Sequence, residues 1–171
     1  EALDGRIAAT RPAAGPDVDL GTVGLGVAVR KGAAKPDLGT VDEIRQALLK
    51  ARAVAVPAST SGIWLVKQLF PRLGIAETIN VKVSPRGSGA TAMVAAGEAD
   101  LGILPVSEIL HDKGVELAGV FPAEMQFIQT FSAAIVAGAS EAEGGKRLIE
   151  FLSSARASEA IKKAGLEPRG K

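Results

Sequence analysis

Three adjacent hydroxyl residues, Ser59, Thr60 and Ser61, stand between an apolar run and a predicted helix in this 171-residue sequence. Gly62 follows them, and apolar residues then recur at helical spacing as far as Leu73. The first N–H groups of a helix have no partner within it, and the helix dipole adds partial positive charge there. Hydroxyl and N–H donors together can receive a carboxylate or an oxyanion. The segment from Ser59 to Gly62 is therefore a candidate ligand-binding segment.

Two other segments also join the end of a predicted strand to a helix. Arg86, Gly87 and Ser88 follow one strand and add a cation to the backbone donors. Pro105 directly follows another apolar strand, two residues before Ser107. Ligands of open parallel sheets bind beyond the carboxyl ends of the strands. We expect these loops and the hydroxyl segment to surround a small anion.

Each candidate also has a purely structural interpretation. A Ser or Thr before a helix commonly serves only as an N-cap, and one hydroxyl is enough for that. Arg86 has the alternative of a solvated loop charge, and Gly87 that of a turn residue. The single Trp, Trp64, is expected to pack in the core or between lobes, and the single His, His111, to lie in an exposed loop.

The sequence gives little support for catalysis. A Ser nucleophile needs a base, and His111 lies in a polar turn with no evident link to Ser61 or Ser88. Neither a Gly-x-Ser-x-Gly elbow nor a phosphate-binding loop is present, and Glu141 and Glu143 fall within a predicted capping box. The chain has no Cys and no cluster of His and acidic residues at metal-binding spacing. We expect no catalytic residue, no metal and no cofactor.

Composition excludes further classes of protein. With 47% hydrophobic residues, the chain can bury one substantial core or two small lobes. The 20 Lys and Arg residues are scattered and nearly balance 19 acidic residues, so nucleic acid is not an expected partner. No apolar run is long enough to span a membrane, and the first residues do not resemble a signal peptide.

The apolar pattern predicts an α/β fold in which short strands alternate with amphipathic helices. Strands are predicted at residues 23–29, 53–56, 80–84, 100–104 and 115–120, and helices at 40–50, 62–73, 90–96 and near Ser107. This alternation is typical of a mainly parallel, doubly wound sheet. Residues 126–136 suit a strand that crosses between lobes.

Two Ser/Thr-x-x-Glu patterns predict capping boxes at helix starts, one at residues 40–43 and one at residues 140–143. The second should open a helix through Leu152. Ser158 is predicted to cap a last helix that ends at Gly165.

Four segments, in this order and spacing, resemble the extracellular solute-binding proteins of ABC importers, in the group of the periplasmic molybdate-binding protein. They are residues 25–33, 60–64, 97–103 and 163–168, and the resemblance runs from about Leu3 to Pro168. It implies a periplasmic-binding fold of the second type, with two hinge strands and a ligand held between two lobes. Residues 126–136 should form one hinge strand, and residues 21–29 its partner.

The resemblance also implies roles for individual residues. Ser61 and Gly87 fall where the family donates backbone N–H groups to an oxyanion. Pro105 falls where the molybdate binders commonly place a Tyr hydroxyl, which proline cannot replace. Molybdate specificity is therefore not implied, and the charge of Arg86 makes a small carboxylate an alternative ligand.

Three parts follow from the resemblance. Residues 1–21 should be the tail of a first-lobe helix and a linker, residues 22–122 the second lobe with the anion-site loops, and residues 123–171 the returning hinge strand and C-terminal helices of the first lobe. The N-terminal part of the first lobe is expected to be absent, as in a fragment or a shortened paralogue. The remnant should expose apolar surface and strand edges, and self-associate.

The implied function is capture of a small oxyanion or carboxylate in the periplasm, after export, and its delivery to an ABC permease in the inner membrane. The alternatives are a sensor domain of the same fold, as in LysR-type transcription factors, a shortened paralogue without a ligand, or an enzyme. A LysR-type regulator would need a preceding helix-turn-helix, which the sequence does not show.

Overall fold

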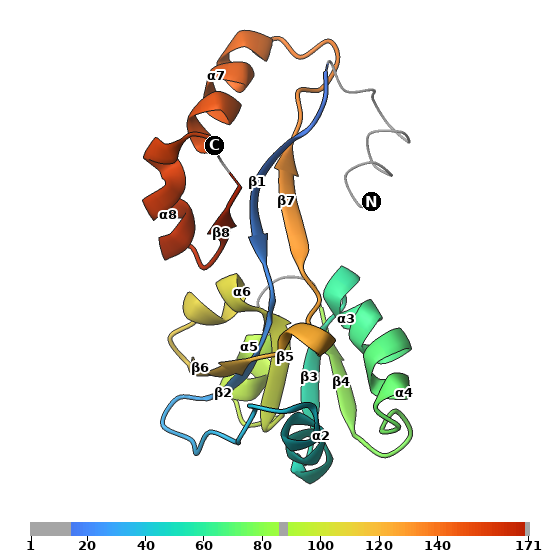
Figure 1. Ribbon diagram of the computed structural model, residues 1–171. Helices are drawn as coiled ribbons and strands as arrows, with labels where there is room; N and C mark the ends of the chain where they lie inside the picture. The colour runs from blue at the N-terminus through green and yellow to red at the C-terminus, as the bar shows by residue number, and fades with distance from the viewer. Residues whose placement is uncertain (1–14, 86–88, 170–171) are drawn as a thin grey trace. The chain divides into compact units, whose positions relative to one another are not determined.

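The computed structural model describes residues 15–85 and 89–169, and the chain divides into two units. Of the described residues, 24–85 and 89–128 form the five-stranded unit, and 15–23 with 129–169 form the three-stranded unit. Each unit is named after its sheet (Figure 1).

The five-stranded unit contains a mainly parallel sheet with the order β4-β3-β5-β2-β6. Its strands are β2 (Leu25–Arg30), β3 (Val54–Pro57), β4 (Val81–Ser84), β5 (Leu101–Pro105) and β6 (Val115–Val120). β3 pairs in parallel with β4 and β5, whereas β2 pairs antiparallel with both β5 and β6. β6 therefore runs in the direction of β3, β4 and β5, and β2 alone is reversed. The predicted α/β class with a mainly parallel sheet is confirmed.

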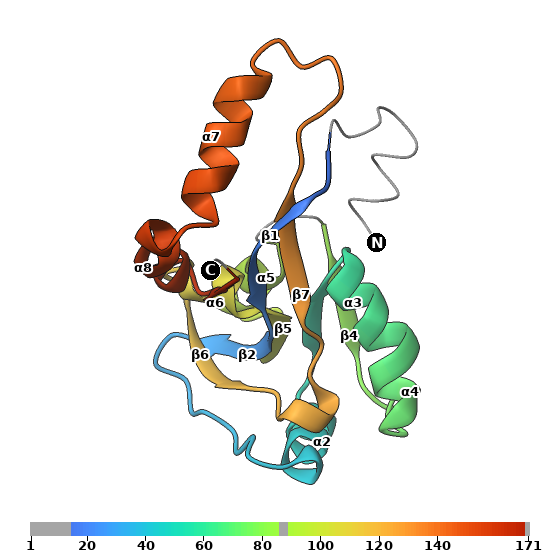
Figure 2. The ribbon, with the colours of Figure 1, turned by 45° about the horizontal axis from the view of Figure 1, so that its top comes forward.

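The helices of this unit lie close to the predicted positions. They are α2 (Val41–Lys50), α3 (Thr60–Trp64), α4 (Phe70–Arg72), α5 (Gly89–Ala95) and α6 (Val106–Leu110), with a 3₁₀ turn at Ala123–Met125. A π-helical turn, Leu65–Leu69, joins α3 to α4, so that they form one helical run (Figure 2). The thirteen-residue run corresponds to the single helix predicted from residue 62 to residue 73.

Strand alternation explains why helices cover both faces of this sheet. Val54 and Val56 of β3 point into one apolar cluster, and Ala53 and Ala55 point into another. The first cluster contains the larger side chains of the strands together with those of α2 and of the run from α3 to α4. The second combines several alanines with Leu104 and Ile109 and receives α5, which packs so closely that a Cβ on Gly102 would lie 3.0 Å from the side chain of Val94.

Local signals fix the ends of several helices. The capping box at the start of α2 is confirmed: the Thr40 hydroxyl accepts from the Glu43 N–H at 3.2 Å, and the Glu43 carboxylate accepts from the Thr40 N–H at 2.9 Å. Gly74 and Gly97 follow helices with φ of +67° and +76°. Glycine adopts this left-handed conformation without strain, so both residues stop their helices.

The three-stranded unit has the strand order β7-β1-β8, and both pairings are antiparallel. Its strands are β1 (Val18–Val23), β7 (Gln129–Ala133) and β8 (Glu167–Pro168), and its helices are α7 (Ala142–Leu152) and α8 (Ser158–Lys163), with a 3₁₀ turn at Ala155–Ala157 between the helices. The antiparallel partner of β7 is β1, and not the whole of residues 21–29 as predicted. The predicted strand is interrupted at Gly24, after which β2 belongs to the other sheet; a Cβ on Gly24 would lie 2.8 Å from the side chain of Gln126.

Both capping predictions in this unit are wrong. α7 begins at Ala142 after Glu141, which makes no side-chain cap, and the Glu143 carboxylate instead accepts from Lys146 Nζ at 2.7 Å. Ser158 is the first residue of α8, and Ala157 holds the N-cap position. The predicted end of this helix is confirmed, because Gly165 follows it with φ of +83°.

Candidate anion-binding site

Three parallel strands of the five-stranded unit end at the same edge of the sheet, and each is followed by one of the loops singled out from the sequence (Figure 1). Pro57 at the end of β3 lies opposite Ser84 at the end of β4. β5, parallel to β3, ends at Pro105. Residues 58–62 and Pro105 thus belong to this edge, while Arg86, Gly87 and Ser88 lie outside the described residues.

The hydroxyl segment starts α3. Ser59 holds the N-cap position in an extended conformation, yet its side chain makes no capping hydrogen bond. Its Oγ lies 3.3 Å from Oγ of Ser61, which is fully buried, whereas Thr60 is exposed. The structural interpretation of Ser59 as an ordinary N-cap is therefore not supported, and the hydroxyl pair remains at the start of the helix.

Gly62 brings α3 against the end of β3. A Cβ built on this buried residue would lie 1.7 Å from the backbone oxygen of Pro57, so that no other residue fits without movement of the backbone. The close approach holds the first turn of the helix, with its N–H groups, beside the end of the strand.

A backbone hydrogen bond joins the end of β4 to the residue that precedes the three hydroxyl residues. Ala58 N donates to the carbonyl oxygen of Ser84 at 3.0 Å. The buried Ser84 hydroxyl donates to the carbonyl oxygen of Pro85 at 3.2 Å. Sequence reasoning placed Ser84 in a strand and did not single it out. A hydroxyl as the last residue of an apolar strand was the signal that could have found it.

Pro105 ends β5 and holds the N-cap position of α6. It is buried and makes no side-chain cap, and Val106 N donates to the carbonyl oxygen of Gly24 at 3.1 Å. Glu108 follows in the first turn of α6, where partial burial raises the pKa of its carboxyl although the side chain still reaches solvent.

Trp64 and His111 make contacts within the protein that suit a structural role. The Trp64 ring is stacked on Phe127 with 4.9 Å between centroids and packs against the larger apolar cluster. His111 is exposed, and its Nδ1 lies 2.7 Å from the carbonyl oxygen of Ser107. Within residues 15–85 and 89–169, no group of three His or acidic side chains is placed to hold a metal ion. No helix in the same residues has the length and apolar character needed to cross a bilayer.

Comparison with known proteins places this geometry in a family. A family model described as bacterial extracellular solute-binding protein matches residues 3–167. In a solved structure, the periplasmic molybdate-binding protein of Azotobacter vinelandii, the same fold is found with a TM-score of 0.67 and 18% identity, over 96% of this chain and 73% of that one.

Two curated relatives are more similar in sequence. Aconitate isomerase from a Pseudomonas species is 36% identical over 172 residues, which is 98% of this chain and 64% of the relative. The molybdate-binding protein ModA of Escherichia coli K12 is 32% identical over 112 residues, covering 64% of this chain and 42% of the relative. The chain thus spans less than two thirds of the length of either relative.

Proposed function

Because this chain belongs to the family of bacterial extracellular solute-binding proteins, we propose that it captures a small anionic solute at the strand-end edge of its five-stranded unit. The observation that carries the proposal is the start of α3, where Ser59 does not cap the helix and its hydroxyl instead lies 3.3 Å from that of Ser61. Uncapped N–H groups, the positive end of the helix dipole and two hydroxyls form a receptor for oxygen anions.

We favour a small carboxylate over a tetrahedral oxyanion such as molybdate. Pro105 has neither a hydroxyl nor an N–H group to offer to an oxyanion. Arg86, two residues after Ser84 in the sequence, has a guanidinium that matches the two oxygens of a carboxylate. The relative that matches almost the whole chain is also named for aconitate, a tricarboxylate.

Isothermal titration calorimetry with cis- and trans-aconitate, acetate, molybdate, sulfate and phosphate tests this proposal. We expect saturable binding of a carboxylate, weakened by about tenfold in Ser61→Ala because a buried donor is lost. Ser140→Ala is the matched control, since Ser140 is an exposed serine of the other unit. Arg86→Gln should weaken carboxylate binding more than any residual molybdate binding. Absence of binding for every anion would contradict the proposal.

Delivery of the solute to an ABC permease, on the outer side of the cytoplasmic membrane, is the physiological role we propose. It rests on the family alone. Uptake of the solute in cells that lack the gene, complemented with the full-length protein or with its Ser61→Ala variant, measures this role.

Isomerisation of aconitate is a second candidate function, favoured by the 36% identity to aconitate isomerase over 98% of this chain. Shifting the double bond of aconitate needs a base that removes a proton from one carbon and returns it to another. Glu108 is the candidate base, because it lies in the first turn of α6, directly after the Pro105 end of β5, and partial burial raises the pKa of its carboxyl, which makes its carboxylate a stronger base. Proton NMR of cis-aconitate incubated with the protein separates the two functions: growth of trans-aconitate that is lost in Glu108→Gln supports the enzyme, and unchanged cis-aconitate supports a binding protein.

A further inference from the structure

A groove lies on the five-stranded unit, at the edge of the sheet opposite the strand-end loops. Arg52 precedes β3 and Asp100 precedes β5, so both lie where these parallel strands begin. β2 runs in the opposite direction, so Arg30 at its end reaches the same edge. The groove between these residues has a volume of about 620 Å³, a size typical of small-molecule sites.

The floor of the groove is apolar. The partly exposed Ala33, Ala47 and Ala51 form it, and their short side chains leave space at the end of α2, whereas the lining residues Val29, Val94 and Leu101 are almost wholly buried. A ligand that filled the groove would therefore lay an apolar body against this floor.

Four cationic side chains and one carboxylate surround the floor, and two of the cations are already engaged. The Arg52 Nη2 donates to Oδ1 of Asp100 at 2.6 Å, and the Arg52 backbone N–H donates to Oδ2 at 2.8 Å. Lys35 Nζ donates to the carbonyl oxygen of Leu117 at 3.0 Å and lies 3.7 Å from the carboxylate of Glu116.

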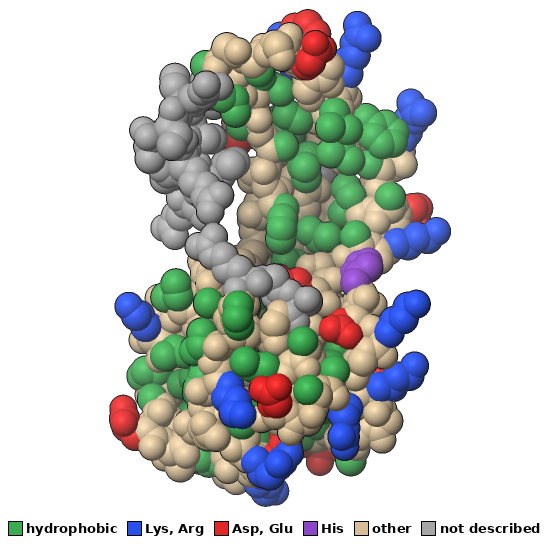
Figure 3. Space-filling model, turned by 180° about the vertical axis from the view of Figure 1, so that it is seen from behind, with side chains coloured by type: hydrophobic (Ala, Val, Ile, Leu, Met, Phe, Trp, Pro, Cys, Tyr) green, Lys and Arg blue, Asp and Glu red, His purple; other side chains and the backbone are tan. Residues whose placement is uncertain are grey.

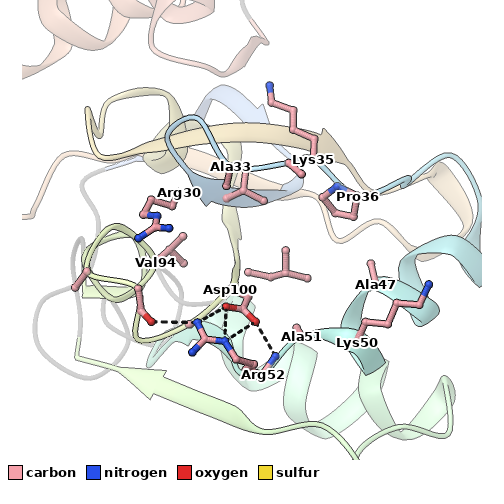
Figure 4. Close-up of a pocket in the computed structure, with 16 residues that line it drawn as sticks. Arg30, Ala33, Lys35, Pro36, Ala47, Lys50, Ala51, Arg52, Val94 and Asp100 are labelled. Carbon is pink, nitrogen blue, oxygen red and sulfur yellow. Dashed lines mark hydrogen bonds and ion pairs between the residues drawn. The ribbon is translucent and has the colours of Figure 1, made fainter.

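The other two cations are Arg30 and Lys50. Both are exposed, and neither side chain makes a hydrogen bond or an ion pair within the part of the chain that the structure describes, although the charge of Arg30 contributes to lowering the pKa of the Asp100 carboxyl. Figure 4 draws them on either side of the Arg52–Asp100 pair. Two separated positive charges above an apolar floor match a ligand that carries two separated negative charges.

The C-terminal ends of two helices weaken the attraction of the groove for an anion. α2 and α5 both end at the groove, and the partial negative charge of their C-termini offsets part of the positive charge of the side chains. The field of the groove alone is therefore weak, and direct contact of an anionic group with each unengaged cation is needed for affinity.

We propose that this groove binds a small organic dianion with a flat apolar body, at a site distinct from the strand-end loops. One anionic group contacts Arg30, the other contacts Lys50, and the body covers Ala33, Ala47 and Ala51. The proposal is independent of the proposed function, since the two sites lie at opposite edges of one sheet and share no residue.

The test is an NMR titration of the ¹⁵N-labelled full chain with naphthalene-2,6-dicarboxylate, a rigid dianion. We expect saturable shifts of the backbone signals of Arg30, Ala47, Lys50 and Asp100. The variant Arg30→Gln/Lys50→Gln should bind at least about tenfold more weakly. The control Lys67→Gln/Lys113→Gln removes two exposed cations that do not line the groove and should bind within about twofold of the parent chain.

Two further probes test the class of ligand. 2-Naphthoate keeps the body but carries one carboxylate, and succinate keeps two carboxylates without the flat body; each should bind at least about tenfold more weakly than the dicarboxylate. Equal affinity of either probe, unchanged affinity in Arg30→Gln/Lys50→Gln, or shifts confined to Ser59, Ser61 or the three-stranded unit would overturn the proposal. Both variants should keep the parent spectrum away from the substitutions, because the replaced side chains are exposed.

Discussion

The two units differ in how far they cover their apolar side chains. In the five-stranded unit, helices on both faces of the sheet bury residues such as Phe70, Leu69 and Ile103 completely or nearly so. In the three-stranded unit, α7 has a strongly apolar side yet no buried residue, and Phe151 remains 44% exposed. Figure 3 shows hydrophobic side chains gathered on the part of the molecule that carries α7 and α8.

This difference shows that an amphipathic pattern predicts a helix but does not ensure its burial. α2 and α7 have similar lengths and both have an apolar stripe, but only α2 buries residues, Ile44 and Leu48. Local stability follows buried apolar contacts, so we expect the three-stranded unit to open more readily than the five-stranded unit.

The largest predicted effect comes from removing the same side chain in both units. Phe70→Ala should lower the free energy of unfolding of the five-stranded unit by about 3–5 kcal/mol, because it leaves a cavity in a closed core. Phe151→Ala should lower that of the three-stranded unit by about 1 kcal/mol, since the ring is partly exposed and its main specific contact is Arg156, 5.5 Å from the ring centroid.

Urea unfolding measures the change in unfolding free energy caused by each of these two substitutions. Fluorescence of Trp64, the single Trp, reports on the five-stranded unit, and hydrogen exchange of α7 and α8 amides reports on the other. Equal losses for the two variants would remove the contrast between the units.

A pair of glutamines sharpens the comparison at the level of hydrogen bonds. Oε1 of Gln126 accepts from the N–H groups of Leu25 at 2.6 Å and Phe127 at 3.0 Å, and its Nε2 donates to the carbonyl oxygens of Leu25 and Phe121, each at 3.1 Å. Gln126→Leu leaves these backbone groups without the amide and should cost about 2–3 kcal/mol.

Gln129 is the counterpart in the three-stranded unit. Its Oε1 is buried and has no hydrogen-bond partner in the described part of the chain. Gln129→Leu should therefore leave the free energy of unfolding within about 0.5 kcal/mol of the parent value or raise it, because a desolvated acceptor is removed. A loss as large as that of Gln126→Leu, in the same urea measurement, would show that Gln129 has an unrecognised partner.

The sequence predicted the structure correctly where the local apolar pattern determines it, and failed where contacts between distant residues determine it. Short apolar runs in residues 53–56 and 100–104 identified β3 and β5, because local pattern and burial agree there. Gly62 was predicted as a possible ligand contact, while its close approach to Pro57 could be recognised only from the structure. The interruption at Gly24 depends on Gln126, a residue far along the chain, and no local pattern reports such a contact.

Two segments of the candidate site, residues 59–62 and Pro105, were also predictable in position, because strand ends followed by helix starts are visible in sequence. The absence of a capping hydrogen bond from the Ser59 side chain could not be predicted from the sequence. An N-cap and a ligand donor have the same residue type and spacing, and whether the hydroxyl makes a capping bond is visible only in the structure.

Substitutions at the two predicted capping boxes should have smaller effects on the free energy of unfolding. Thr40→Ala should cost about 1 kcal/mol, because the hydroxyl accepts from the Glu43 N–H. Ser140→Ala should change stability by less than about 0.5 kcal/mol, because Glu141 holds the N-cap position of α7. Urea midpoints of the two variants measure the difference, and a loss in Ser140→Ala equal to that in Thr40→Ala would restore the second capping box.

The smallest predicted effects are the pH dependences of two exposed ion pairs, one in each unit. The hydrogen bond from the Arg52 side chain, supported by the Arg52 N–H, holds the pKa of the Asp100 carboxyl below its usual value. The hydrogen bond to Glu143 raises the pKa of Lys146. Both pairs are accessible to solvent, which limits their contribution to stability.

The two shifts act at opposite ends of the pH range. A lowered carboxyl pKa stabilises the folded state above the usual carboxyl value, and this contribution is lost as the pH falls through the lowered value. A raised lysine pKa stabilises the folded state at pH values below the usual lysine pKa, and this contribution is lost as the pH rises through the raised value.

The urea midpoint of Asp100→Asn should therefore lie below that of the parent chain at pH 7 and converge with it in acid, whereas that of Lys146→Gln should converge with it only in alkali. Asp100 also accepts the Arg52 backbone N–H at 2.8 Å, so its variant should show the larger difference at pH 7. Convergence of both variants at the same end of the pH range would show that these ion pairs do not cause the differences.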